Sequence, residues 1–166
     1  MQNNQEEITE MALRIANHVQ AKYTIEEFNI IANWVTDFAW KHIRSIPCKT
    51  NRKSRLRPIV TCLEYREGMK DINGDPVDPR CLGLTFRAGR NLVKSNSKTV
   101  FNRKRAEVFL YVRNDYGLTI KSILHELLHA RGFAHGKMYG LDFHLEHHLD
   151  TAAESLGVFL GLIPSI

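Results

Sequence analysis

The sequence predicts an α+β fold: helices at the amino end, a small three- to four-stranded mixed sheet, then two more helices. Apolar residues recur at helical spacing near both ends of the chain, and three short apolar runs lie between them. With 166 residues the chain can bury its own core, so we expect a single domain over residues 1–166.

The two helices at the amino end are predicted by different signals. Residues 5–20 carry an apolar stripe at helical spacing. Thr24 and Glu27 form a capping-box pattern, so we expect the second helix to begin there and to end near Arg44.

The three strands are expected at about 59–65, 81–88 and 106–113. The third is apolar on both faces, as is typical of a covered strand. The segment 71–76 begins like a calcium loop, but Pro76 stands where that loop needs glycine, so we predict a connecting turn.

Two helices are expected after the sheet, at about 119–131 and about 141–160, with Gly132 ending the first. The last helix carries an acidic residue at every fourth position, which we interpret as a solvated face. These residues are Asp142, Glu146, Asp150 and Glu154.

Composition narrows the class of protein. The hydrophobic share of 43% and charged share of 25% are those of an ordinary globular chain. The first residues lack the pattern of a secretory signal and no run of 18 apolar residues occurs, so we expect a soluble, cytoplasmic protein without membrane contact. The cysteines, Cys48, Cys62 and Cys81, have irregular spacing, which favours reduced thiols over a disulfide or a zinc knuckle.

The net charge of +5 is concentrated in the middle of the chain, where no acidic residue occurs between Asp78 and Glu107. Such a region would attract the phosphates of DNA or RNA, although a solvated basic face without a partner is the simpler interpretation. The candidate nucleic-acid-binding residues are Arg52, Lys53, Arg55, Arg57, Arg103, Lys104 and Arg105.

A metal-binding motif lies in the predicted helix 119–131. His125 and His129 are four residues apart, so a helix places both imidazoles on one face, where they can reach one ion. A catalytic zinc takes three protein ligands, and Gly132 allows the sharp turn that would return His135 to the ion. Three imidazoles favour Zn²⁺.

Glu126 directly follows the first histidine, so its carboxylate lies beside the expected ion. In that position it can act as the general base toward a zinc-bound water and later protonate the leaving amine. A His-Glu-His face on an otherwise apolar helix costs stability unless it is paired or binds metal, which favours a functional interpretation.

The run from His125 to His135 matches the extended H-E-x-x-H-x-x-G-x-x-H signature of metzincin-type zinc peptidases, which have the zincin fold. The order of elements over about half of the chain resembles the compact SprT-like peptidases, and His135-Gly136 resembles part of their ligand loop. The resemblance implies a zinc metalloendopeptidase in which Glu126 activates a zinc-bound water. It also implies that an edge strand in the 57–113 region holds the peptide.

Several alternatives remain open at this stage. Tyr139 stands where a closer SprT-like match has histidine, and it could instead stabilise the transition state. Glu154 or Glu146 could replace His135 as third ligand, as in the gluzincin pattern.

Other functions fit parts of the sequence. The bacterial rRNA-maturation endonucleases (YbeY-like) share the His-x3-His-x5-His spacing, but they have glycine at the position of Glu126. A non-catalytic zinc-binding module would need a fourth ligand, and no cysteine lies within thirty residues of the motif. A protease acting on nucleic-acid-associated proteins would use both the motif and the basic region.

Overall fold

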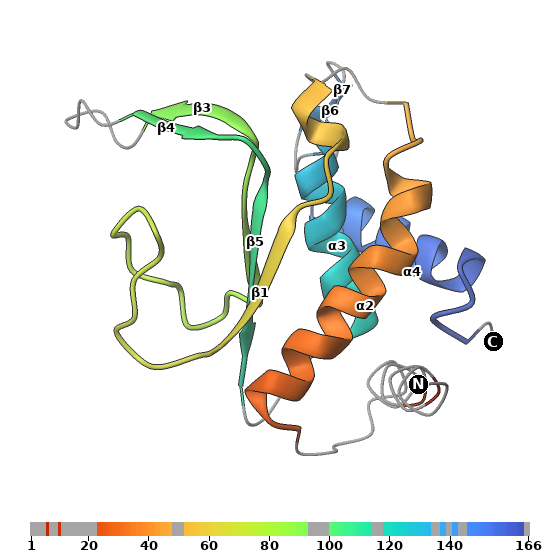
Figure 1. The fold of residues 1–166 in the computed structure, drawn as a ribbon, viewed down its shortest axis with the longest axis horizontal. Coiled ribbons are helices and arrows are strands. Elements are labelled where there is room, and N and C mark those ends of the chain that lie inside the picture. The colour runs from red at the N-terminus through yellow and green to blue at the C-terminus, as the bar shows by residue number, and fades with distance from the viewer. Residues whose placement is uncertain are drawn as a thin grey trace.

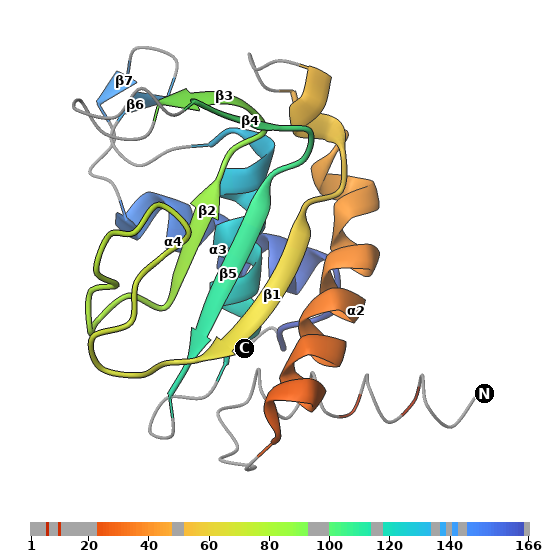
Figure 2. The ribbon, with the colours of Figure 1, turned by 60° about the vertical axis from the view of Figure 1, so that its left-hand side comes forward.

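The structure is a computed structural model, drawn in Figures 1 and 2. It describes Glu6, Glu10 and residues 23–47, 52–92, 100–113, 118–133, 137–138, 141–142 and 146–164. Only the backbone is described for 52–53, 89–92, 100–102, 137–138, 141–142 and 146–148. The first expected helix, at 5–20, lies outside the described residues except for Glu6 and Glu10.

A mixed three-stranded sheet forms the centre of the fold, with β5 (Glu107–Val112) between β1 (Ile59–Glu64) and β2 (Gly83–Phe86). Strand β1 runs parallel to β5, and β2 runs antiparallel to it. Val108 and Leu110 of the central strand are almost fully buried. The expected α+β class and the three main strands are therefore confirmed.

Two short strand pairs were not predicted from the sequence. Strand β3 (Gly89–Leu92) pairs with β4 (Val100–Arg103), and β6 (Lys137–Met138) pairs with β7 (Leu141–Asp142). A 3-10 turn, η1 (Arg52–Arg55), precedes β1.

The described residues form three helices: α2 (Ile25–Ile43) and α3 (Ile120–Arg131), which pack against the sheet, and α4 (Glu146–Phe159), which packs against α3. Figure 1 shows α2 and α3 beside the sheet and α4 on the far side of α3. The last helix begins at Glu146 rather than near residue 141, because residues 141–142 are paired in β7.

Local signals explain where α2 begins. The Thr24 hydroxyl accepts from the amide of Glu27, and the Glu27 carboxylate accepts from the amide of Thr24. This is the capping box predicted above, and it satisfies two amides that a helix start leaves without partners.

The outer edge of β1 is closed by amide side chains from α2. Asn29 donates to the carbonyl of Cys62 at 3.1 Å and accepts from its amide at 2.7 Å, and Asn33 donates to the carbonyl of Val60 at 3.2 Å. Figure 2 shows α2 running along this edge. Edge strands covered in this way are poor templates for another strand. The opposite edge of the sheet is β2, which has no further neighbouring strand among the described residues.

The loop between β1 and β2 contains the predicted turn. The Asp71 carboxylate accepts from the amides of Asn73 and Asp75, and Gly74 has a φ of 82°. The segment is therefore a tight connection, as expected. None of the helices in the described part of the chain has the length and apolar content needed to cross a membrane.

Candidate metal site

Helix α3 fixes the positions of the three motif residues. Thr119 caps its first turn by accepting from the amide of Ser122. Ile123, Leu124 and Leu127 are fully buried between the sheet and the other helices, so the helix cannot rotate without exposing them.

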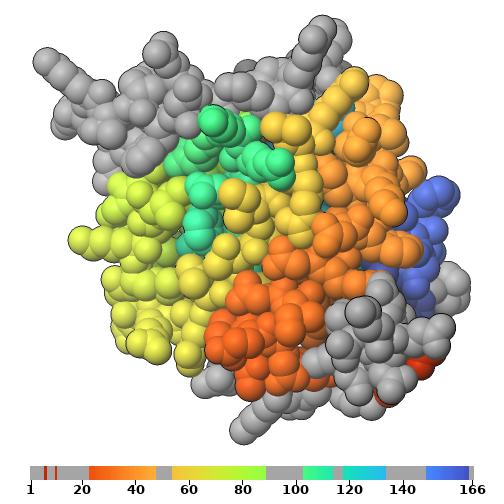
Figure 3. Space-filling model, viewed as in Figure 1, coloured from red at the N-terminus to blue at the C-terminus, as the bar shows by residue number. Residues whose placement is uncertain are grey.

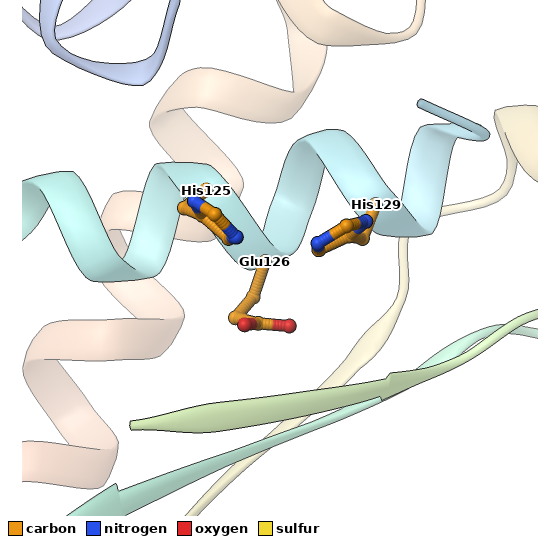
Figure 4. A group of neighbouring side chains, drawn as sticks. All are labelled: His125, Glu126 and His129. Atoms are coloured by element: carbon orange, nitrogen blue, oxygen red, sulfur yellow. The ribbon is translucent and has the colours of Figure 1, made fainter. Parts of the chain in front are cut away.

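His125, Glu126 and His129 form a compact group on this helix. One donor atom from each lies within 4.8 Å of the others, which is close enough for one metal ion. The two imidazole centroids are 4.9 Å apart. Figure 4 shows the rings one turn apart on α3, with the Glu126 carboxylate directed toward the sheet.

The hydrogen bonds of the two rings determine which nitrogen is available to a metal. Nδ1 of His125 is 2.7 Å from a carboxylate oxygen of Asp150, and Nδ1 of His129 is 2.8 Å from the carbonyl oxygen of Phe133. Both partners are acceptors, so each Nδ1 donates to its partner, and Nε2 is the ring nitrogen that a metal ion would bind. Metal-binding histidines in proteins are usually held in this way.

Gly132 accounts for the contact of His129 with Phe133. Its φ of 125° turns the chain, and its amide donates to the carbonyls of Leu128 and His129. The turn brings the Phe133 carbonyl back over the last helical turn, where His129 reaches it. The turn at Gly132 is therefore as expected, and the return of His135 to the ion stays a prediction, because His135 lies outside the described residues.

Asp150 is the functional candidate that the sequence interpretation missed in the acidic row of α4. Its carboxylate contacts His125 and is not simply part of a solvated face, although its side chain remains 43% exposed. The contact joins residues 25 positions apart and depends on how α4 packs against α3, so no local signal points to it.

Strand β2 supports the Glu126 carboxylate. The Thr85 hydroxyl lies 2.5 Å from Oε2 of Glu126 and 3.2 Å from its main-chain oxygen. A Cβ added to Gly83 would come within 2.8 Å of the Glu126 side chain, so the absence of a side chain there makes room for it. An isolated glycine in a strand often marks such an approach, and this signal could have been read from the sequence.

The proposed third ligand lies outside the described residues. This holds for His135 and also for Tyr139, and the side chain of Glu146 is not described either. Glu154 is described, is exposed, and does not belong to the three-residue group.

The candidate basic residues whose side chains are described fall into two sets: those that are paired or buried within the protein and those that are exposed. Arg57 pairs with Asp37 at 2.6 Å, and Arg103 is buried, contacting Glu107 and the ring of Phe86. These contacts give both arginines structural roles. Three others are exposed, namely Arg55, Lys104 and Arg105, whereas the side chains of Arg52 and Lys53 are not described.

Two protonated groups lie near the glutamate. Burial raises the pKa of Cys81, and the nearby Glu126 carboxylate acts in the same direction, against a hydrogen bond with the backbone of Gly83 that lowers it. Burial also raises the pKa of Tyr111 to about 12. Both side chains are therefore neutral near pH 7 and add no charge to the site.

No protein-family model, curated protein or solved structure matches this chain. The resemblance to zinc peptidases accordingly rests on the motif residues, and the structure contributes the arrangement of the group around His125.

Proposed function

We propose that the chain is a zinc-dependent metalloendopeptidase in which His125 and His129 bind the ion and Glu126 is the general base. The observation that carries the proposal is the grouping of the two imidazoles and the carboxylate, whose donor atoms lie within 4.8 Å of one another. The Nδ1 atoms of the rings donate to Asp150 and Phe133, so Nε2 is the ligand atom of each ring in this proposal. Imidazole ligands favour Zn²⁺ over Mg²⁺ or Ca²⁺.

A zinc ion bound to these histidines would supply an acidified water and polarise the substrate carbonyl. The proton is transferred by Glu126, which accepts it from the attacking water and delivers it to the leaving amine. Glu126 is a buried residue, only 7% exposed, so few competing water molecules reach it.

The open edge of β2 supports a polypeptide substrate. The amide of Tyr111 donates to the carbonyl of Leu82, so the main-chain groups of Leu82 and Leu84 face β5 and those of Gly83 and Thr85 face outward. An extended peptide added there would lie along the strand that contacts Glu126. The other edge is closed by Asn29.

His135 is the third ligand in this proposal, because its spacing from His129 matches the extended motif. Glu146 is the alternative, since it lies one turn before Asp150 on α4. A non-catalytic zinc module is the competing function for the same ligands.

A nucleic-acid-associated substrate is favoured by one feature of the topology. Because β1 and β5 are parallel, the segments that precede them meet at the same end of the sheet, where the amide of Ile59 donates to the carbonyl of Ala106. Figure 3 shows these two segments side by side. The exposed Arg55 lies in one of these segments and the exposed Lys104 and Arg105 lie in the other, and Arg55 also lines a surface hollow with Arg44.

The first experiment measures zinc content and casein hydrolysis of the wild-type protein beside Glu126→Gln and His135→Ala. Glu126→Gln should keep its zinc and lose hydrolysis, and His135→Ala should lose most of its zinc. The matched control is Glu67→Gln, which removes a carboxylate from an exposed turn. Hydrolysis that survives in Glu126→Gln would exclude Glu126 as the base, and full zinc retention in His135→Ala would move the third ligand to Glu146.

RNA cleavage and DNA binding are tested in parallel. A wild-type protein that cleaves RNA and leaves casein intact would favour the endoribonuclease alternative. DNA affinity should fall with salt and with a double Lys104→Ala, Arg105→Ala variant. The control is the double Arg66→Ala, Arg80→Ala variant, which removes two exposed charges from the other end of the sheet. Negligible binding at low salt would exclude a nucleic-acid partner.

A further inference from the structure

We propose that Thr85 is a positioning residue for Glu126: its hydroxyl binds one carboxylate oxygen and so fixes the orientation in which Glu126 acts as the base. This inference rests on the proposed function and adds a residue from a different element, 41 positions away in the sequence. The residue lies on β2, which has no second neighbouring strand in the described part of the chain.

The contact involves two oxygens of the same residue. The Thr85 hydroxyl lies 2.5 Å from Oε2 and 3.2 Å from the main-chain oxygen of Glu126. Because the hydroxyl has a single proton, it shares that proton between the two acceptors. The side chain of Glu126 is thereby tied to its own helix backbone through Thr85.

Gly83 completes the surface on which Glu126 lies. Residues 83 and 85 are two apart on β2, so both face α3. At position 83 any Cβ would come within 2.8 Å of Cγ and 3.0 Å of Oε1 of Glu126. The strand therefore holds Oε2 with one residue and leaves space for Oε1 with the other.

A general base works best when its orientation is fixed before the substrate arrives. A glutamate side chain has three rotatable bonds, and a hydrogen bond to the charged carboxylate is about twice as strong as one between neutral groups. Holding Oε2 therefore restricts the rotation of the carboxylate that accepts the proton. Thr85 acts here through Glu126 and does not itself touch the reacting atoms.

The same residue has a second connection to the substrate edge. The main-chain amide and carbonyl of Thr85 face outward from β5, where an added peptide strand would pair with them. Pairing would restrain the backbone of β2 and so steady the hydroxyl that contacts Glu126. Binding of a peptide and alignment of the base are therefore linked through one residue.

The test compares Thr85→Ser with Thr85→Val in the zinc-loaded, full-length protein. Serine keeps the hydroxyl, whereas valine keeps the shape and removes the donor. We expect Thr85→Val to lower kcat by about tenfold to a hundredfold with KM changed by less than about twofold. Thr85→Ser should stay within about threefold of the wild type in kcat.

Two measurements that do not depend on turnover accompany the kinetics. Zinc affinity should be the same in both variants, because Thr85 contacts neither histidine in this scheme. Acetohydroxamate, a zinc chelator whose proton needs a neighbouring carboxylate as acceptor, should bind Thr85→Val about tenfold more weakly than Thr85→Ser. A third variant, Gly83→Ala, should displace Glu126 and lower kcat in the same way.

The outcomes separate this inference from the proposed function. A wild-type protein without hydrolase activity, or an active Glu126→Gln variant, would defeat the proposed function. An active wild type whose Thr85→Val variant has an unchanged kcat would overturn only the role of Thr85. Equal losses in Thr85→Ser and Thr85→Val would also overturn it, since the hydroxyl would then contribute nothing beyond packing.

Discussion

The contact between His125 and Asp150 predicts that α4 controls metal affinity. Asp150→Ala removes the carboxylate that lies 2.7 Å from Nδ1 of His125, so the ring is held less firmly in the orientation in which Nε2 would bind the ion. Loss of such a partner typically weakens metal binding by about 10- to 100-fold, or about 1.4–2.7 kcal/mol. Asp150→Asn keeps an acceptor but no charge, so we expect a loss near the lower limit.

The stability of the metal-free protein should respond much less. The Asp150 side chain is 43% exposed, so solvent screens its interaction with His125, and the contribution to folding should be below about 1 kcal/mol. The affinity is measured by competition with a chromophoric zinc chelator, with urea unfolding of the apo-protein as a second readout. Glu67→Gln serves as the charge-matched control. A zinc affinity of Asp150→Ala within about twofold of the wild type would refute the reasoning.

Three further outcomes follow from the structure. Gly132→Ala forces alanine to a φ of 125°, so it should lower the free energy of unfolding by about 1–2 kcal/mol and also weaken zinc binding. The control is Gly74→Ala, at a φ of 82° in a turn outside the motif, which should lower the free energy of unfolding without changing zinc binding. Asn29→Ala removes both side-chain bonds to the backbone of Cys62 and should cost about 1–3 kcal/mol in urea unfolding, whereas the exposed Glu26→Ala should cost almost nothing. Burial raises the pKa of Cys62 from 9.0 to about 12, so the folded state binds more protons in that range. The contribution of this thiol to the free energy of unfolding is fully present below pH 9.0 and is lost as the pH rises toward 12, by up to about 1.4 kcal/mol per pH unit. The free energy of unfolding of Cys62→Ala should therefore decline less steeply over this pH range.

Features with local causes could be predicted from the sequence. The motif helix was expected at about 119–131 and spans Ile120–Arg131, because a threonine cap and a glycine end mark both of its limits. The three apolar strands were located within a few residues for a similar reason. Their apolar residues alternate or run continuously according to whether one or both faces of the strand are buried, and this pattern can be read from the sequence.

Features that depend on pairing at a distance were missed. Strands β3 and β4 contain Gly-Arg-Asn-Leu and Val-Phe-Asn-Arg, which lack a continuous apolar run, so only their mutual hydrogen bonding defines them. The partners of the motif, Asp150 and Thr85, approach it only after α4 and β2 have packed against α3. Sequence spacing identified the possible ligands, and tertiary packing determined which atoms orient them.

The side-chain amides of Asn29 and Asn33 also limit how copies of this protein can associate through the sheet. With one edge of the described sheet blocked, strand addition would take place along β2, where Thr85 presents its main-chain groups. Self-association through the described sheet would then occupy the surface proposed for the peptide. Pairing between copies of the protein and binding of a peptide would therefore exclude each other.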